Sequence, residues 1–261
     1  MPTPTPMVPQ AMTAAKADAM TVRFAPPEEA LYLLLAWLSP SFPVGAYTYS
    51  HGLEWAVEDG AVTDAASLSA WLDDVLCHGA GRSDAILLAR GMEAASAADE
   101  ETFRGLLDLA LALQPSQERR LETGAQGDAF ITAIRAAWMP ECGSAAALFD
   151  RLTTGGAAIP RGGWAYPLAL ALAASAWRLP VAATVGAYLH AFAANLVSAA
   201  IRAVPLGQSD GQRVMNRLRA TTQALSAEAI AAPLDEIGGC AFISDIASMR
   251  HETQYTRLFR S

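Results

Sequence analysis

The sequence predicts an all-α protein, a single-domain bundle of roughly ten helices. Apolar residues recur at intervals of three and four along most of the chain, which is the period of an α-helix. No stretch alternates apolar and polar residues for long enough to form a strand, and Val and Ile are few beside Ala and Leu. With 52% hydrophobic and 17% charged residues, the chain must bury much of its surface, in its own core or against partners.

The first 27 residues differ in composition from the rest of the chain. They hold six of the 15 prolines and show no hydrophobic period. We therefore predict a disordered, proline-rich tail over residues 1–27, followed by a helical domain over residues 28–249. The chain does not begin with a basic stretch followed by an apolar one, so we expect no signal peptide and a cytoplasmic location.

Prolines and capping residues set the expected helix boundaries. The first helical period ends before Pro40, because the residue that precedes a proline avoids the α region. A short helix is expected over residues 50–58, and Thr63 or Asp64 can cap the next one. Further helical segments are expected near residues 84–97, 100–113, 117–139 and 145–153.

Residues 164–204 form the most apolar region. No charged residue lies between Arg178 and Arg202, and that stretch is long enough to cross a membrane. However, His190 and Asn195 lie within it and Ala is abundant, which weakens membrane insertion. We predict a central helix that neighbours or a partner subunit bury on most sides. A small helical membrane protein is the alternative.

The charge and the cysteines exclude two further classes. A formal net charge of −8 disfavours a nucleic-acid-binding protein. The three cysteines, Cys77, Cys142 and Cys240, form no close pair, so neither a disulfide framework nor a thiolate zinc site is indicated. We predict that all three are buried thiols.

The chain shows no catalytic motif. Its four histidines form no metal-ligand pattern, and neither a nucleophile elbow nor a glycine-rich phosphate loop is present. We therefore predict no catalytic residue, no metal ligand and no cofactor. A helical hydrolase or lyase is the alternative, and it would use His51 with Glu54 as its acid and base.

Three segments are too particular for a plain helical bundle. The first reads SPSFPVGAYTYSHGLE over residues 39–54, where two prolines and a glycine fix the loop geometry. Ser50 is placed to cap the following helix, and Tyr47 and Tyr49 combine an apolar body with a polar tip, as interface residues often do. A rigid turn between two core helices is the other interpretation, and both can hold at once.

The second segment, residues 204–213, contains Pro205 and Gly207. Ser209 or Asp210 can start the next helix, and this capping role is favoured over an anion site because no Lys is present. The third segment, residues 249–261, holds three arginines together with aromatic and apolar residues. Such a composition is typical of a binding segment, although it also fits a last helical turn docked on its own domain.

Together the three segments resemble the signatures of the urease accessory protein UreF family, in the family's order along the chain. The resemblance spans roughly residue 28 to the end, and it departs from the family pattern at Leu170 and Ala171, where a glycine is common. The residues expected to contact partners are Tyr47, Tyr49, Ser50, His51, Glu54, Pro205, Gly207, Gln208, Gln212, Arg250, His251, Glu252, Tyr255, Arg257, Leu258 and Phe259.

The resemblance implies an all-helical, dimeric protein that is not itself an enzyme. Such a protein binds UreD (also called UreH) and the GTPase UreG, and the complex docks on apo-urease and supports GTP-dependent nickel insertion. Nickel would be the cargo of the complex and would not bind tightly to this chain. We further hypothesise that residues 250–261 form a tail that is mobile in the free protein and orders on a UreD-like partner.

Overall fold

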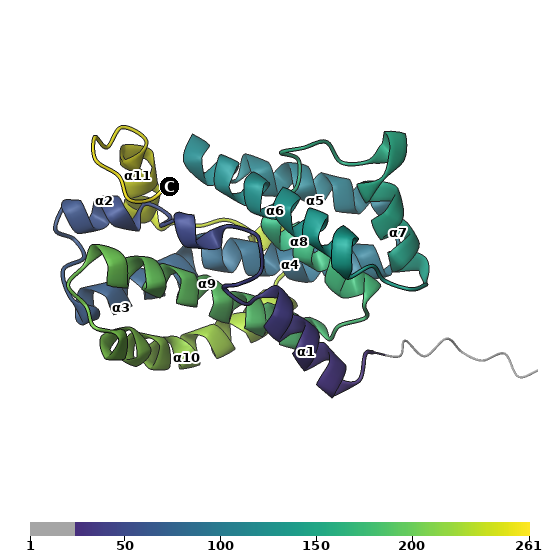
Figure 1. The fold of residues 1–261 in the computed structure, drawn as a ribbon, viewed down its shortest axis with the longest axis horizontal. Helices are drawn as coiled ribbons and strands as arrows, with labels where there is room; N and C mark the ends of the chain where they lie inside the picture. Colours follow the sequence, from purple (N-terminus) through teal and green to yellow (C-terminus); the bar gives the residue numbers. More distant parts are fainter. Residues whose placement is uncertain (1–23) are drawn as a thin grey trace, which may run out of the picture.

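A computed structural model describes residues 24–261, and it confirms the all-α prediction (Figure 1). The described residues form eleven α-helices and three short 3-10 turns, and they contain no strand. The helices are α1 (Pro27–Trp37), α2 (Leu53–Glu58), α3 (Ala65–His78), α4 (Ala80–Ser96), α5 (Glu100–Ala112), α6 (Gln117–Ala137), α7 (Ser144–Thr153), α8 (Tyr166–Ala176), α9 (Val181–Ala203), α10 (Gln208–Ala231) and α11 (Phe242–His251). Of the tail predicted over residues 1–27, residues 1–23 lie outside the described residues.

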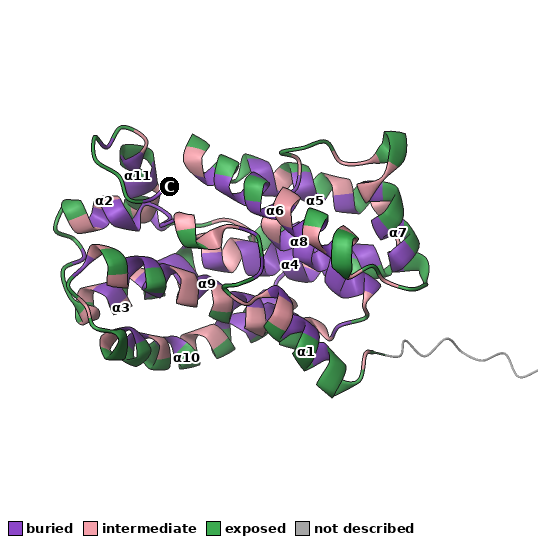
Figure 2. Cartoon of the chain, in the orientation of Figure 1, coloured by how far each residue is buried: buried purple, intermediate pink, exposed green. Residues whose placement is uncertain are grey.

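Helix α8 lies at the centre of the bundle. It packs along α4, α6 and α7, and every residue from Pro167 to Ala176 is buried (Figure 2). Gly91 of α4 allows the close approach, because a Cβ atom there would lie 2.6 Å from Cδ1 of Leu168 and 3.0 Å from Cβ of Ala171. Small residues on both helices thus let the backbones of α4 and α8 lie close together, and this apolar packing forms the core.

Helix α9 was predicted to be a central helix buried on most sides by neighbours or by a partner subunit, but its neighbours in this chain bury it only in part. It is long and apolar enough to cross a membrane, but only half of its most apolar stretch is buried. Val185, Leu189 and Leu196 face the bundle, while His190 and Ser198 are exposed. Because α9 packs on α10, α4 and α2, its apolar face serves the core of this bundle.

The starts of α3 and α10 were both predicted from capping residues. Asp64 caps α3 as predicted, since its side chain accepts hydrogen bonds from the Ala66 and Ser67 amides at 2.9 and 2.8 Å. Helix α10 begins at Gln208, earlier than a cap at residue 209 or 210 would place it. The Asp210 carboxylate instead reaches back and accepts a hydrogen bond from the Gly207 amide at 3.1 Å.

The prediction of three buried thiols is wrong. Cys77 is partly buried, whereas Cys142 and Cys240 are exposed. Cys142 lies in the turn between α6 and α7, and Cys240 lies in the loop before α11. Loops run over the surface, so their position overrides the usual preference of cysteine for burial.

Candidate docking site at the C-terminal segment

The first signature segment forms a rigid connection from α1 to α2. Gly45, with φ of 73°, starts the 3-10 turn Ala46–Thr48. Gly52, with φ of 75°, precedes α2 in the left-handed conformation that favours glycine. A Cβ atom at Gly52 would lie 2.5 Å from the amide nitrogen of Ser248. The start of α2 therefore lies in backbone contact with α11.

The segment that follows α11 returns across the first signature. The amide of Ser50 donates a hydrogen bond to the carbonyl oxygen of Ser261 at 2.6 Å, and its hydroxyl donates to the same oxygen. The amide of Arg260 donates to the carbonyl oxygen of Thr48 at 2.8 Å. The tail expected to be mobile is thus packed on its own domain, because these backbone bonds and the buried Phe259 ring hold it there.

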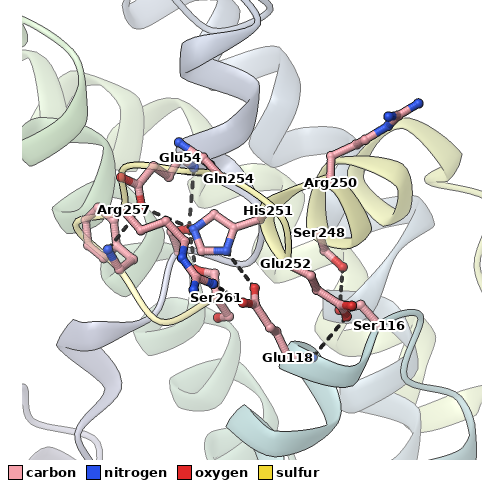
Figure 3. Close-up of polar contacts among 12 residues, drawn as sticks. Glu54, Ser116, Glu118, Ser248, Arg250, His251, Glu252, Gln254, Arg257 and Ser261 are labelled. Atoms are coloured by element: carbon pink, nitrogen blue, oxygen red, sulfur yellow. Dashed lines mark hydrogen bonds and ion pairs between the residues drawn. The ribbon is translucent and has the colours of Figure 1, made fainter.

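Glu54 of α2 joins the returning segment to the body of the protein. Its carboxylate accepts hydrogen bonds from the amides of Leu258 and Phe259, at 2.7 and 3.0 Å. Nε2 of His251 lies 3.2 Å from the same carboxylate. Ser50, which was expected to cap α2, lies 3.4 Å from the Glu54 amide and mainly holds Ser261. A single buried glutamate therefore fixes both ends of the segment (Figure 3).

His251, the last residue of α11, lies between two carboxylates (Figure 3). Its ring is fully buried, with Nε2 facing Glu54 and Nδ1 lying 2.6 Å from Oε2 of Glu118. The other oxygen of Glu118 accepts a hydrogen bond from Arg257 at 2.6 Å. Glu252 accepts a hydrogen bond from the first amide of α6 at 2.7 Å and so satisfies the start of that helix. Helices α2, α6 and α11 are joined at this point.

A second buried ion cluster lies beside the first. Glu122 accepts from Nε2 of His51 at 2.6 Å and from the Ser261 hydroxyl at 2.6 Å, and it pairs with Arg119. Burial alone would raise the pKa of Glu122, but the charges of Arg119 and His51 outweigh it and hold that pKa at about 2. Burial, together with the Arg119 charge, lowers the pKa of His51.

Two cavities flank this cluster, with volumes of about 250 and 280 Å³. Both are lined by His51, Asp84 and Arg119. Burial raises the pKa of Asp84 to about 6, although the Tyr188 hydroxyl donates a hydrogen bond to it at 2.7 Å. The buried charged groups of this cluster therefore line cavity walls as well as contacting one another.

Helix α11 leaves its large apolar side chains outside. Exposed fractions are 67% for Phe242, 71% for Ile243, 54% for Ile246 and 49% for Met249. The inward face carries Ala247 and Ser248, because the close contact with Gly52 admits only small side chains. This surface was not predicted from the sequence. The spacing of residues 242, 246 and 249 could have revealed it, although that pattern usually marks a buried face.

The predicted partner residues divide into exposed and buried groups. Those exposed are Tyr47, Pro205, Gly207, Gln208, Gln212, Arg250, Tyr255, Arg257 and Leu258. Those buried are Tyr49, Ser50, His51, Glu54, His251 and Phe259, and Glu252 is intermediate. The structure brings the first and third segments together. The second segment follows α9. Near the end of α9, the Arg202 guanidinium lies 4.4 Å from the centroid of the Phe259 ring.

The acid and base expected of a hydrolase do not pair with each other. His51 contacts Glu122, whereas Glu54 contacts His251. Fold and site together define a helical protein whose buried ionisable groups tie its own segments together, and which presents an exposed apolar helix face beside them. Exposed apolar faces of this kind are typical of protein interaction surfaces.

Comparison with known proteins specifies the family. The UreF family profile matches residues 62–219. A urease accessory protein UreF from Rhodopseudomonas palustris (strain HaA2) is 51% identical over 88% of this chain and 93% of its own length. The protein of that name from Methylobacterium sp. (strain 4-46) is 53% identical, over 88% of each chain, and that from Bradyrhizobium diazoefficiens is 47% identical, over 89% and 92%. The chain belongs to the UreF family of urease accessory proteins.

Proposed function

We propose that this chain assists GTP-dependent nickel insertion into apo-urease in the cytoplasm by docking other accessory proteins. The observation that carries the proposal is the exposed apolar face of α11, made of Phe242, Ile243, Ile246 and Met249. Exposed apolar residues that share one helix face are typical of a protein–protein interface. We propose that this face, with the exposed side chains of Tyr255 and Leu258, binds a UreD/UreH protein.

The charges around the face indicate the chemistry of that partner. Arg250 points away from the buried cluster, and Arg257 and Arg260 are exposed on the returning segment (Figure 3). An apolar centre bordered by arginines fits a partner surface with an apolar centre and acidic residues around it. Because the segment is already docked, binding does not incur the cost of ordering it, about 1–2 kcal/mol per residue for the backbone.

For the GTPase UreG we propose a separate surface. Tyr47 is the exposed aromatic residue of the first signature, and Gln208 and Gln212 are exposed at the start of α10. Changing both glutamines to Ala should weaken capture of the GTPase and leave capture of the UreD/UreH protein unchanged. Equal loss of both partners would contradict this separation of surfaces.

We also propose that two copies associate through the partly exposed α9, whose residues Ala182, Ala183 and His190 are open to solvent. Sedimentation of the purified chain at tens of micromolar checks this, and a monomer there would contradict it. Nickel is proposed to be cargo without a resident site on the isolated chain. Equilibrium dialysis that finds one tightly bound nickel per chain would contradict that proposal.

The main experiment tests the α11 face directly. Ile246→Glu places a charge in the centre of the face without touching the buried cluster, and we expect at least a tenfold weaker complex with a UreD/UreH protein. Leu35→Glu is the matched control, since Leu35 is an exposed apolar residue on α1. Unchanged circular dichroism of both variants excludes misfolding. Undiminished binding by Ile246→Glu would overturn the proposal.

A further inference from the structure

The cavity of about 250 Å³ is lined by residues of the first signature segment, α6, α8 and α9. It reaches the surface, because the exposed residues Pro40, Tyr47 and His190 belong to its lining. Asp84 of α4 also lines it and is only 7% exposed. A buried carboxylate with a raised pKa, in a cavity that a small molecule can enter, is typical of a ligand site.

Two hydrogen-bond acceptors beside this cavity lack a donor. The Tyr188 hydroxyl donates to Oδ2 of Asp84 at 2.7 Å, but no residue in the range 24–261 donates to Oδ1. Nδ1 of His51, which lines the same cavity, has no partner among these residues either. Nε2 of His51 lies 2.6 Å from Glu122, and burial lowers the pKa of His51. The ring is therefore neutral with its proton on Nε2, which leaves Nδ1 as an acceptor.

The buried charges around the cavity leave it negative. Arg119 and Glu122 form an ion pair, and their charges act on the Asp84 carboxyl in opposite directions. Burial raises the pKa of Asp84 only to about 6, so this carboxylate is charged at neutral pH without a cation of its own. Because His51 is neutral, the buried ionised groups of the lining are one cation and two anions. This balance favours a cationic ligand over an anionic one.

Three aromatic rings line the cavity beside Asp84. The ring centroids of Tyr166 and Tyr188 lie 5.9 Å apart, and those of Tyr188 and Phe192 lie 6.3 Å apart. Because Tyr188 donates to Asp84, this series of rings adjoins the carboxylate. Ring faces attract cations, and they also provide apolar surface for a short carbon chain. The lining thus combines an anionic acceptor with aromatic surface.

From this combination we propose that the cavity binds a small organic cation, with an ammonium or guanidinium group on a short carbon chain. The N–H groups of the ligand donate to Asp84 and to Nδ1 of His51, and its carbon atoms lie against the three rings. A resident divalent metal fits less well, because the described part of the chain has no group of three or more His, Cys, Asp or Glu side chains that could hold one. The site is separate from the α11 face and does not depend on the proposed function.

Titration of the full chain with butylammonium chloride near neutral pH tests the proposal. NMR of the backbone amides and aromatic rings should show saturable shifts confined to residues that line the cavity, with a dissociation constant of about 1 mM. Sodium chloride at the same ionic strength controls for charge screening, and sodium butyrate controls for binding through the carbon chain alone. Equal shifts with butyrate, or no saturation by about 50 mM butylammonium, would overturn the proposal.

Asp84→Asn removes the charge and keeps an oxygen that can accept from Tyr188. We expect it to bind butylammonium at least about tenfold more weakly. Asp108→Asn, at an exposed position of α5, removes the same charge outside the cavity lining and should bind as the unmodified protein does. Undiminished binding by Asp84→Asn would refute the assignment.

A second variant tests the cavity without changing its charge. Ala194 lines the cavity from α9, and Ala194→Phe narrows it while Asp84 stays in place. We expect this variant also to bind butylammonium more weakly, with circular dichroism showing that both variants are folded. Full binding by a folded Ala194→Phe would place the ligand outside the cavity and so contradict the proposal.

Discussion

The α8 core and the docked C-terminal segment are both buried, but different forces bury them. Around α8, Ala and Leu side chains pack without any charged residue between Pro167 and Ala176. Around His251, hydrogen bonds and ion pairs join α2, α6, α11 and the segments beside them through three glutamates, two histidines and two arginines. The first region depends on buried apolar area, and the second depends on hydrogen bonds and ion pairs among its polar groups.

This difference predicts how each region fails. Apolar packing in the core is shared by many neighbours, so α8 can be exposed only when the whole bundle unfolds. The C-terminal segment depends on a few directional bonds to Glu54, Glu118 and Glu122, so it can open while the bundle stays folded.

The largest effect is expected in the core. Phe130 of α6 is fully buried, and its ring contacts the rings of Trp37, Phe42 and Tyr166. Phe130→Ala should lower the free energy of unfolding by about 3–5 kcal/mol, because it removes buried area and leaves a cavity. Urea denaturation measures this. Leu121→Ala, at an exposed position of the same helix, should change stability by no more than about 0.5 kcal/mol.

A smaller and local effect is expected at the segment. Glu54→Ala leaves the buried amide of Phe259 and the ring of His251 without an acceptor, each at a cost of about 1–3 kcal/mol. We expect faster hydrogen exchange over residues 252–261, with the exchange of α8 unchanged. Asp59→Ala, at the exposed end of α2, is the control. If α8 also exchanged faster, the two regions would not be independent.

The sequence predicted the helices of both regions but the packing of neither. Helices and the Asp64 cap follow from spacing within a few residues, and they were found. The ion clusters join residues far apart in the chain, such as His251 and Glu54, 197 positions apart, which no local pattern reveals. The face of α11 was missed because an apolar stripe on a helix usually faces the core, whereas contact with Gly52 turns the small side chains of α11 inward.

A substitution at Asp84 shows whether a buried charge stabilises the core, as the buried glutamates stabilise the C-terminal segment. Its pKa in the folded chain is about 6, above the ordinary 3.8, so the folded state binds this proton more tightly than the unfolded state. Stability therefore falls as the pH rises from about 3.8 to 6, and the full penalty remains above that range. Asp84→Asn should raise stability by about 1–2 kcal/mol at pH 7.5. It should have no effect near pH 3.5, as urea denaturation at both pH values would show.

The smallest effect is expected for the cap of α3, which lies outside both regions. The Asp64 side chain accepts from two amides at the start of α3, and it lies on the exposed surface. Asp64→Ala should therefore lower the free energy of unfolding by less than Glu54→Ala does, and Asp64→Asn, which keeps an acceptor, should lower it less still. The pKa of this carboxyl is lowered by the Ser67 amide and hydroxyl, so its contribution is present above pH 3.8 and is lost below it. A cost in Asp64→Ala larger than that in Glu54→Ala would mean that local capping outweighs the long-range cluster.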